Sequence, residues 1–300
     1  STSRATSPDF VNWSGQALMS YSDTGTAVPS QHLYTNQTQP YFRAPHVYVA
    51  MPGRIHFGRR ALSADQARFY ETELDPIAGG AGDVSDGVLL TTRAGSTRYD
   101  FTFKESFVRP GLGSENWTSR SNYPALGVVQ TGPAEMSIYV QRHYGHEMAH
   151  LQRMTLRLDG FASLHAPYAG GQMVTTPLTF AGRYLELNYA TSAAGSIRVE
   201  VQDRSGRPVP GYSLEDCPYI VGDEISRVVG WDRRAVREPV PETGAHEELT
   251  RGQSTVAFEE GPVLREAPSD LARLAGTPVR LRFVMKDADL FSLRFVPEAP

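Results

Sequence analysis

Cysteine and lysine are almost missing from this 300-residue sequence. Cys217 is its one cysteine, which excludes an intrachain disulfide and a cysteine-rich zinc site. Lys104 and Lys286 are its only lysines, so arginine carries nearly all of the cationic charge. An apolar run of membrane-spanning length and a signal peptide are missing too. We therefore expect no membrane partner, and the sequence leaves the localisation open, with secreted and periplasmic locations included.

The sequence also lacks an excess of charge of either sign. Its 29 lysines and arginines against 33 aspartates and glutamates give a formal net charge of −4, and no basic cluster is interleaved with aromatic residues. It contains no glycine-rich phosphate loop, no GxSxG nucleophile elbow and no redox CxxC pair. We therefore expect no nucleic-acid partner and no site of these three common kinds.

The stretch from Tyr34 to Pro52 combines amides, aromatic rings and an arginine. Because proline cannot donate to a β-ladder, Pro40 and Pro45 are predicted to mark the two ends of one short strand. Such a strand would hold an arginine at its end, among groups that suit a sugar or a carboxylated sugar. The alternative is a strand-edge arginine paired with a carboxylate. The residues predicted to bind substrate in this stretch are Asn36, Gln39, Arg43 and His46.

Two regions of the chain repeat the same order of loop and strands. Residues 34–110 and 120–165 each contain a polar loop and then short alternating strands separated by turns, with Asp86-Gly87 read as one of these turns. Four-stranded units of roughly 40–50 residues are typical of β-propeller blades. We therefore predict that residues 1–167 form two blades and part of a third.

The pattern changes near residue 168. Apolar residues alternate at 185, 187 and 189, at 197, 199 and 201, at 279, 281 and 283, and at 291, 293 and 295. Long, cleanly alternating strands with few helices are typical of a β-sandwich. The prediction for residues 168–300 is therefore a β-sandwich, and the predicted fold class is all-β.

Several segments resemble one group of bacterial proteins, the glycoside-hydrolase-like proteins common in planctomycetes, which are related to the five-bladed propellers of the invertase and arabinanase clans. The similarity covers nearly the whole chain except residues 235–268. The segments that carry it are HLYTNQTQPYFRAPH (32–46), SDGVLL (85–90), RPGLGSENW (109–117), NYPALGVVQTGPAEMSIYVQRHYG (122–145), LRLDGFASL (156–164), TSAAGSIRVEVQD (191–203), GYSLEDCPYIVGDEI (211–225) and PVRLRFVMKDADLFSLRF (278–295).

The resemblance implies a larger assembly. Related proteins carry further blades before the position equivalent to Ser3, and in the invertase and arabinanase clans acidic residues of the early blades do most of the chemistry. Residues 1–167 would then be the C-terminal blades of a five-bladed propeller. Because two and a fraction blades would leave sheet edges open, we expect upstream sequence or another chain to supply the remaining blades.

Hydrolysis of a glycosidic bond generally needs two carboxyl groups that flank it. The predicted catalytic residues are Asp86 and Glu115, although Asp86 could instead cap an Asx-turn. Trp117 is predicted to stack on a sugar ring, while Arg120 and His143 are predicted to contact the substrate. A lone histidine at a strand end is the structural alternative for His143.

We predict a glycoside hydrolase that acts on a glycan in an axial propeller pocket. Two alternatives stay open: a non-catalytic glycan-binding protein, and a sialidase-like exo-hydrolase with an arginine triad from Arg43, Arg109 and Arg120. No cofactor is expected beyond a structural calcium ion that Asp287 and Asp289 could bind, with a turn cap as the alternative. The histidines at 143, 146 and 150 have metal-ligand spacing, but a strand context and Gly145 argue against a zinc site.

Overall fold

The chain is an all-β protein in its computed structural model, which describes residues 1–69, 82–232 and 269–298. Two compact units are distinguished, Ser1–Leu158 and Asp159–Pro300, called here the N-terminal and the C-terminal unit. The boundary that the sequence suggested, near residue 168, lies just after strand β14 (Leu164–Ala166) of the C-terminal unit. Within the described residues, no helix is long and apolar enough to cross a membrane.

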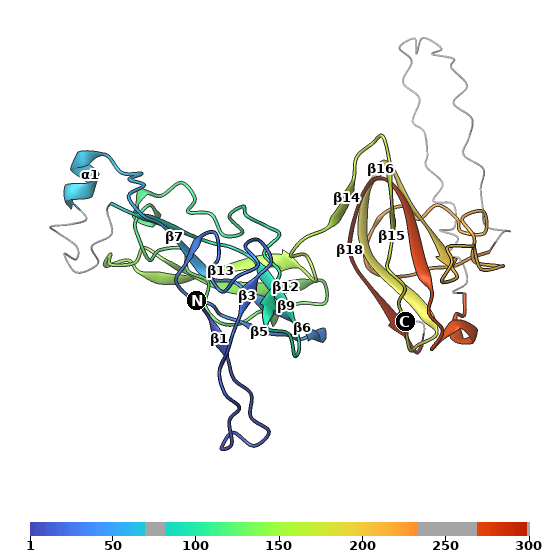
Figure 1. The fold of residues 1–300 in the computed structure, drawn as a ribbon. Helices are drawn as coiled ribbons and strands as arrows, with labels where there is room; N and C mark the ends of the chain where they lie inside the picture. The colour runs from blue at the N-terminus through green and yellow to red at the C-terminus, as the bar shows by residue number, and fades with distance from the viewer. Residues whose placement is uncertain (70–81, 233–268, 299–300) are drawn as a thin grey trace, which may run out of the picture. The chain divides into compact units, whose positions relative to one another are not determined.

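The N-terminal unit is built from short strands (Figure 1). Among the described residues of this unit, the helical elements are α1 (Ala64–Phe69) and a 3-10 helix at Ser114–Asn116. The strands are β1 (Ser3–Arg4), β2 (Ala17–Leu18), β3 (Ser20–Tyr21), β4 (His32–Leu33), β5 (Gln39–Tyr41), β6 (Ala44–Ala50), β7 (Gly53–His56), β8 (Val84–Gly87), β9 (Leu90–Arg93), β10 (Arg98–Tyr99), β11 (Val129–Gln130), β12 (Glu135–Arg142) and β13 (His150–Arg157).

Most of these strands belong to two antiparallel meanders. In the first, the sheets β5-β6-β9 and β4-β7-β8 lie along the same three stretches of chain, residues 32–41, 44–56 and 84–93. Bridges from Thr91 to Asp100 and from Gly87 to Val108 add a fourth segment. The second meander is β11-β12-β13, extended by a bridge from Pro124 to Val140.

Two local predictions in the first meander, one of a strand and one of a turn, are wrong. Pro40 and Pro45 lie in different strands, β5 and β6, which a tight turn at Phe42-Arg43 joins into a hairpin. Pro40 is tolerated because β5 is the edge strand of its sheet, where a missing N–H leaves no ladder bond unmade. Asp86 and Gly87 form no turn either, because both are paired with β7 inside strand β8.

Ser63 followed three residues later by Gln66 is the sequence pattern of a capping box, and it forms at the N-terminus of α1. The backbone N–H of Gln66 donates to Ser63 Oγ at 3.2 Å, and the backbone N–H of Ser63 donates to Gln66 Oε1 at 3.0 Å. These reciprocal bonds are a capping box, which satisfies two backbone donors that the helix itself leaves free.

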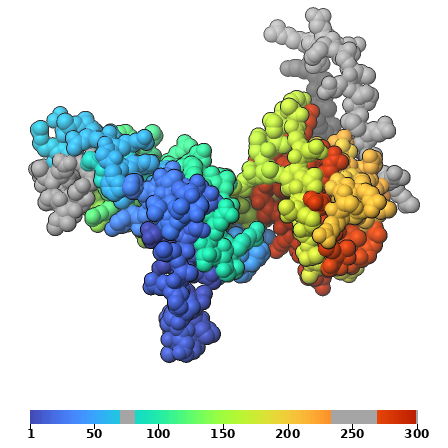
Figure 2. All heavy atoms as spheres, viewed as in Figure 1, coloured from blue at the N-terminus to red at the C-terminus, as the bar shows by residue number. Residues whose placement is uncertain are grey.

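A loop between β1 and β2 projects from the N-terminal unit (Figure 1, Figure 2). Asp9 organises this loop by accepting the backbone N–H groups of Val11 at 2.9 Å and of Asn12 at 2.7 Å. The base of the same hairpin forms one wall of the pocket described below.

The C-terminal unit is one curled antiparallel sheet in the order β14-β18-β16-β17, with β15 also paired to β18 (Figure 1). The predicted apolar side chains at 185, 187, 189, 197, 199 and 201 are all buried, and the intervening Glu186, Asn188 and Glu200 are buried as well. The four separate alternating segments of the prediction are joined into two strands, β16 and β18. Besides β14, its strands are β15 (Gly171–Val174), β16 (Tyr184–Gln202), β17 (Asp223–Val228) and β18 (Arg280–Val296).

The long strands bend where their pairing register shifts, between Thr191 and Ser196 of β16. Gly195 lies in this bend, and a Cβ built on it would come within 2.3 Å of the carbonyl oxygen of Asp287. Asp287 itself has a positive φ of 42°. The bend therefore depends on a residue without a side chain at 195, and it lets one sheet fold around its own apolar face.

Candidate functional site

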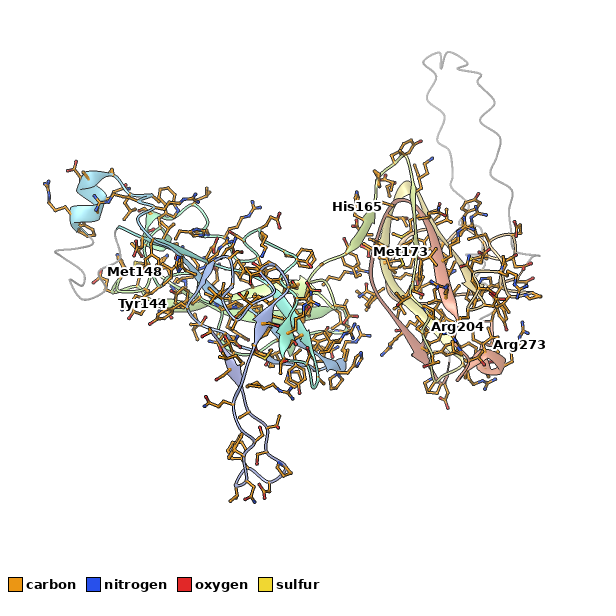
Figure 3. All side chains as sticks on the ribbon, in the orientation of Figure 1. Tyr144, Met148, His165, Met173, Arg204 and Arg273 are labelled. Atoms are coloured by element: carbon orange, nitrogen blue, oxygen red, sulfur yellow. The ribbon has the colours of Figure 1, made fainter. Side chains whose placement is uncertain are left out.

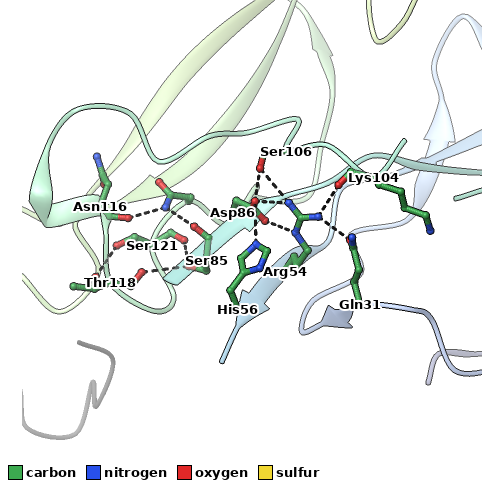
Figure 4. Close-up of polar contacts among 11 residues, drawn as sticks. Gln31, Arg54, His56, Ser85, Asp86, Lys104, Ser106, Asn116, Thr118 and Ser121 are labelled. Atoms are coloured by element: carbon green, nitrogen blue, oxygen red, sulfur yellow. Dashed lines mark hydrogen bonds and ion pairs between the residues drawn. The ribbon is translucent and has the colours of Figure 1, made fainter. Parts of the chain in front are cut away.

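Asp86 lies in a buried ion pair that crosses from β8 to β7 (Figure 4). Arg54 Nε donates to Asp86 Oδ1 at 2.7 Å, and Arg54 Nη2 donates to Asp86 Oδ2 at 2.5 Å. Ser106 Oγ also donates to Asp86 Oδ2, and His56 Nε2 lies 3.3 Å from the same oxygen. The guanidinium is held further by Gln31 Oε1 and by the carbonyl of Lys104, both at 2.7 Å.

These neighbouring groups determine the protonation state of Asp86. Burial alone would raise its pKa, but hydrogen bonds from Arg54 and Ser106 and the positive charge of Arg54 outweigh burial, so the pKa lies below its ordinary value. The carboxylate is therefore ionised and cannot serve as a general acid near neutral pH. With both oxygens engaged and the residue only 5% exposed, its geometry is that of a structural ion pair.

A second buried polar network fixes the loop that carries Glu115 (Figure 4). Asn122 is fully buried, and its Nδ2 donates to the carbonyls of Ser85 at 2.8 Å and Asn116 at 2.9 Å. Arg142 donates to Asn122 Oδ1 and, at 3.2 Å, to the carbonyl of Arg109. Because strand residues on both sides anchor it, this loop has a defined conformation.

Glu115 and Trp117 both contact neighbouring parts of the N-terminal unit. Glu115 is half-buried in the 3-10 helix, and its negative charge acts on His143. Trp117 packs against Leu62 and Ala67, while its Nε1 donates to the carbonyl of Gly111 at 2.9 Å. The indole is therefore part of a small core as well as half-exposed, and stacking on a sugar ring stays a prediction.

His143 belongs to a group of three histidines: His143 and His146 lie on the loop between β12 and β13, which also carries Tyr144 and Met148 (Figure 3), and His150 is the first residue of β13. Its ring centroid lies 4.8 Å from that of His150 and 6.0 Å from that of His146. Burial, followed by the neighbouring His150, lowers the pKa of His143. The His143 ring therefore carries little charge at neutral pH.

No metal centre is found in the part of the chain that the structure describes. No three histidine, cysteine, aspartate or glutamate side chains among those residues are placed to hold a metal ion. Asp289 is engaged by Ser163, whose Oγ donates to its Oδ1 at 2.6 Å, and by His165 Nδ1 at 3.2 Å from the same oxygen. A structural calcium ion at Asp287 and Asp289 stays a prediction.

An open pocket of about 380 Å³ lies between the N-terminal hairpin and the first meander. Its polar wall is built by Asn36 and Thr38, which meet the phenol of Tyr99: Asn36 Nδ2 donates to the Tyr99 hydroxyl at 3.1 Å, and Thr38 Oγ1 lies 2.7 Å from it. The residues that line the pocket are Thr2, Ser3, Arg4, Ala5, Thr6, Met19, Asn36, Thr38, Tyr48, Thr92, Arg93, Ser96 and Tyr99.

The lining of this pocket carries positive charge and no negative charge. Two of its lining residues, Arg4 and Arg93, are cationic, and none of them is acidic. Arg4 Nη1 donates to the carbonyl of Ser96 at 3.2 Å, which leaves further guanidinium donors for a ligand. Arg93 is exposed at the end of β9, and no ion pair within the described ranges involves it. The pocket therefore suits an anionic or strongly polar ligand.

Of the predicted substrate-binding residues, the structure places Asn36 in this pocket and the others elsewhere. Arg43 is half-buried in the β5–β6 turn, Gln39 is half-buried in β5, and His46 is exposed on β6. Arg120 lies near Tyr144, whose hydroxyl accepts its Nη1 at 3.3 Å. Neither Arg43 nor the two predicted catalytic carboxylates line this pocket.

Sequence reasoning missed Arg4, Thr38, Arg93 and Tyr99. Arg93 follows the pattern that drew attention to Arg43, since it is an arginine at a strand end after two threonines. Arg4 carries no comparable signal, because only the pairing of β1 with β2 brings it to the pocket. No protein-family model, no curated protein and no solved structure matches this chain.

Proposed function

We propose that this chain binds an acidic glycan in the pocket between the N-terminal hairpin and the first meander. The observation that carries the proposal is the composition of the pocket lining. Asn36, Thr38 and Tyr99 form a hydrogen-bonded polar wall, two arginines line the same pocket, and no carboxylate does. Amide and hydroxyl groups match sugar hydroxyls, and guanidinium groups match carboxylate or sulfate. The half-buried ring of Tyr48 adds an aromatic surface.

Glycoside hydrolysis is the second candidate, and it is supported by the resemblance of the sequence to propeller glycosidases. It requires two carboxyl groups beside the scissile bond. Asp86 is engaged in its ion pair, and Glu115 is the half-buried carboxyl group that remains of the two predicted catalysts. We therefore propose binding as the role of this pocket, with hydrolysis dependent on carboxyl groups from further blades of upstream sequence or another chain.

The proposed architecture follows the same resemblance. The two antiparallel meanders of the N-terminal unit would be blades of a five-bladed β-propeller, and the curled sheet of the C-terminal unit would be a β-sandwich module. The short strands and the meander order are compatible with blades.

Replacing Arg93 with alanine should weaken binding of an acidic oligosaccharide, such as oligogalacturonate, by roughly 10-fold or more. A hydrogen bond to a charged group contributes about 1.5–3 kcal/mol, and each 1.4 kcal/mol corresponds to a factor of ten. Isothermal titration calorimetry would measure the effect. Neutral oligosaccharides should bind the wild-type protein much more weakly than acidic ones.

Arg59→Ala is the matched control, because Arg59 is exposed, carries the same charge and does not line the pocket. An equal loss in both variants would show that binding depends only on net charge. Failure of acidic and neutral oligosaccharides alike to bind the wild-type protein would overturn the proposed function.

A further inference from the structure

A second open pocket, of about 310 Å³, lies at the turn between β9 and β10. Tyr99 lines the first pocket, whereas its two neighbours in the chain, Arg98 and Asp100, line the second. Neighbouring side chains of an extended segment point to opposite faces, so the two pockets are lined by opposite faces of this segment. The residues that line both pockets are Thr92, Arg93 and Ser96.

The lining of the second pocket carries charges of both signs. Arg93, Arg98 and Asp100 line it and are exposed, and none of the three takes part in an ion pair within the described residues. Asp100 Oδ1 accepts Thr102 Oγ1 at 2.5 Å and Ser22 Oγ at 3.5 Å, while no bond from a described residue reaches Asp100 Oδ2. Unpaired charges of both signs in one pocket suit a ligand that itself carries both.

Arg98 and Asp100 are held on one face of an anchored segment. Alternate residues of an extended segment share a face and lie about 6–7 Å apart along it. The backbone N–H of Asp100 donates to the carbonyl of Thr91 at 2.7 Å, and the N–H of Thr91 donates back to the carbonyl of Asp100 at 3.1 Å. The N–H of Arg98 donates to Ser96 Oγ at 3.0 Å, and Thr92 Oγ1 donates to the carbonyl of Arg98 at 2.7 Å. One small molecule can therefore reach both charges without a rearrangement of the backbone.

The rest of the lining is small and mostly polar. It presents the hydroxyls of Ser22, Thr91, Thr92 and Ser96, one aliphatic side chain, Val47, and no aromatic ring. A sugar would find no aromatic face on which to stack. The volume also lies at the lower end of the range of about 300–1,000 Å³ that is usual for small-molecule sites. The lining therefore favours a compact zwitterion over a sugar.

We propose that the second pocket binds a free α-amino acid with a small polar side chain, of the size of serine. Asp100 Oδ2 accepts hydrogen bonds from the ammonium group, and the guanidinium of Arg98, together with that of Arg93, donates to the carboxylate. Val47 and the hydroxyls contact the remainder of the ligand. This inference goes beyond the proposed function and does not rest on it, because Arg98 and Asp100 do not line the first pocket.

Three related ligands and two variants test this assignment, with binding measured by NMR chemical-shift changes of the backbone amides of β9 and β10. L-Serine carries both charges, N-acetylserine only the carboxylate, and serinamide only the ammonium group. Asp100→Asn should weaken the binding of serine and serinamide by roughly fivefold or more, but not that of N-acetylserine. Arg98→Gln should weaken the binding of serine and N-acetylserine by roughly the same factor, but not that of serinamide.

The ligand that each variant should still bind shows that the variant is folded. Asp65→Asn and Arg59→Gln are matched controls, because both residues are exposed and line neither pocket, and they should leave the affinity for all three ligands unchanged. Equal losses for all three ligands in Asp100→Asn and Arg98→Gln would overturn the proposal, as would serine that bound no tighter than either analogue. Muramic acid, an amino sugar with a carboxylate, is the sugar arm, and tighter binding of it than of serine would overturn the assignment to an amino acid. None of these ligands is a glycan chain, so the result is separate from that of the oligosaccharide titration.

Discussion

Asp86→Asn should lower the free energy of unfolding of the N-terminal unit by about 3–5 kcal/mol, the cost of removing one partner from a buried ion pair. Asparagine keeps the size of the side chain but leaves Arg54 as a buried cation, and one of its two terminal groups is a donor facing the donors of Arg54. Chemical denaturation measured by circular dichroism would give the change.

Asp65→Asn is the matched control, because Asp65 is exposed in the first turn of α1 and should change stability by less than about 1 kcal/mol. The outcome also decides between the two roles of Asp86. If Asp86→Asn abolished an activity while leaving the unfolding free energy unchanged, the ion pair would be functional and its structural assignment would be wrong.

The same ion pair predicts how stability depends on pH. Because the folded-state pKa of Asp86 lies below its ordinary value, its contribution is complete above the unfolded pKa of about 4 and is lost as the pH falls toward the folded pKa. As the pH falls below about 4, wild type should therefore lose stability more steeply than Asp86→Asn, in which position 86 no longer titrates. Parallel acid-unfolding curves would contradict the ion pair.

Gly195→Ala should destabilise the C-terminal unit by about 3 kcal/mol, at the upper end of the usual cost of overpacking. The new Cβ would approach the carbonyl oxygens of Asp287 and Lys286 to 2.3 Å and 2.8 Å. Both are backbone atoms of β18, so no side-chain rotation can relieve the contact. The sheet would have to shift where it bends.

Gly171→Ala in β15 is the matched control. A Cβ at Gly171 would meet only the Cβ of Ala166, at 3.9 Å, and the position needs no positive φ. Thermal unfolding should show a large drop for the first variant and almost none for the second. Equal melting temperatures would show that the bend at Gly195 is not tightly packed.

The sequence predicted the structure well where a feature depends only on residues that are close together in the chain. The alternation along residues 185–201 correctly predicted which apolar side chains share the core, because the side chains of a strand alternate between its two faces. Ser63 and Gln66 predicted a capping box, since both partners lie within one turn of chain. In each case, all the information needed is contained in a few neighbouring residues.

The sequence predicted poorly where a residue's role depends on distant partners. Asp86 followed by Gly87 looks like a turn locally, yet pairing with β7 makes it strand and places Arg54, 32 positions away, against its carboxylate. The pocket likewise needs β1, the segment around Asn36 and the end of β9 to meet. No pattern of neighbouring residues predicts such contacts between distant segments.

The sequence by itself therefore determined the all-β class, the buried face of the long strands, the cap of α1 and the exclusion of disulfide chemistry. Only the tertiary structure decided that Asp86 is ion-paired and that Arg4 and Arg93 face one pocket. Propensity and periodicity act between near neighbours. The charge, burial and free hydrogen-bond donors of a site are set by residues that folding brings together from far along the chain.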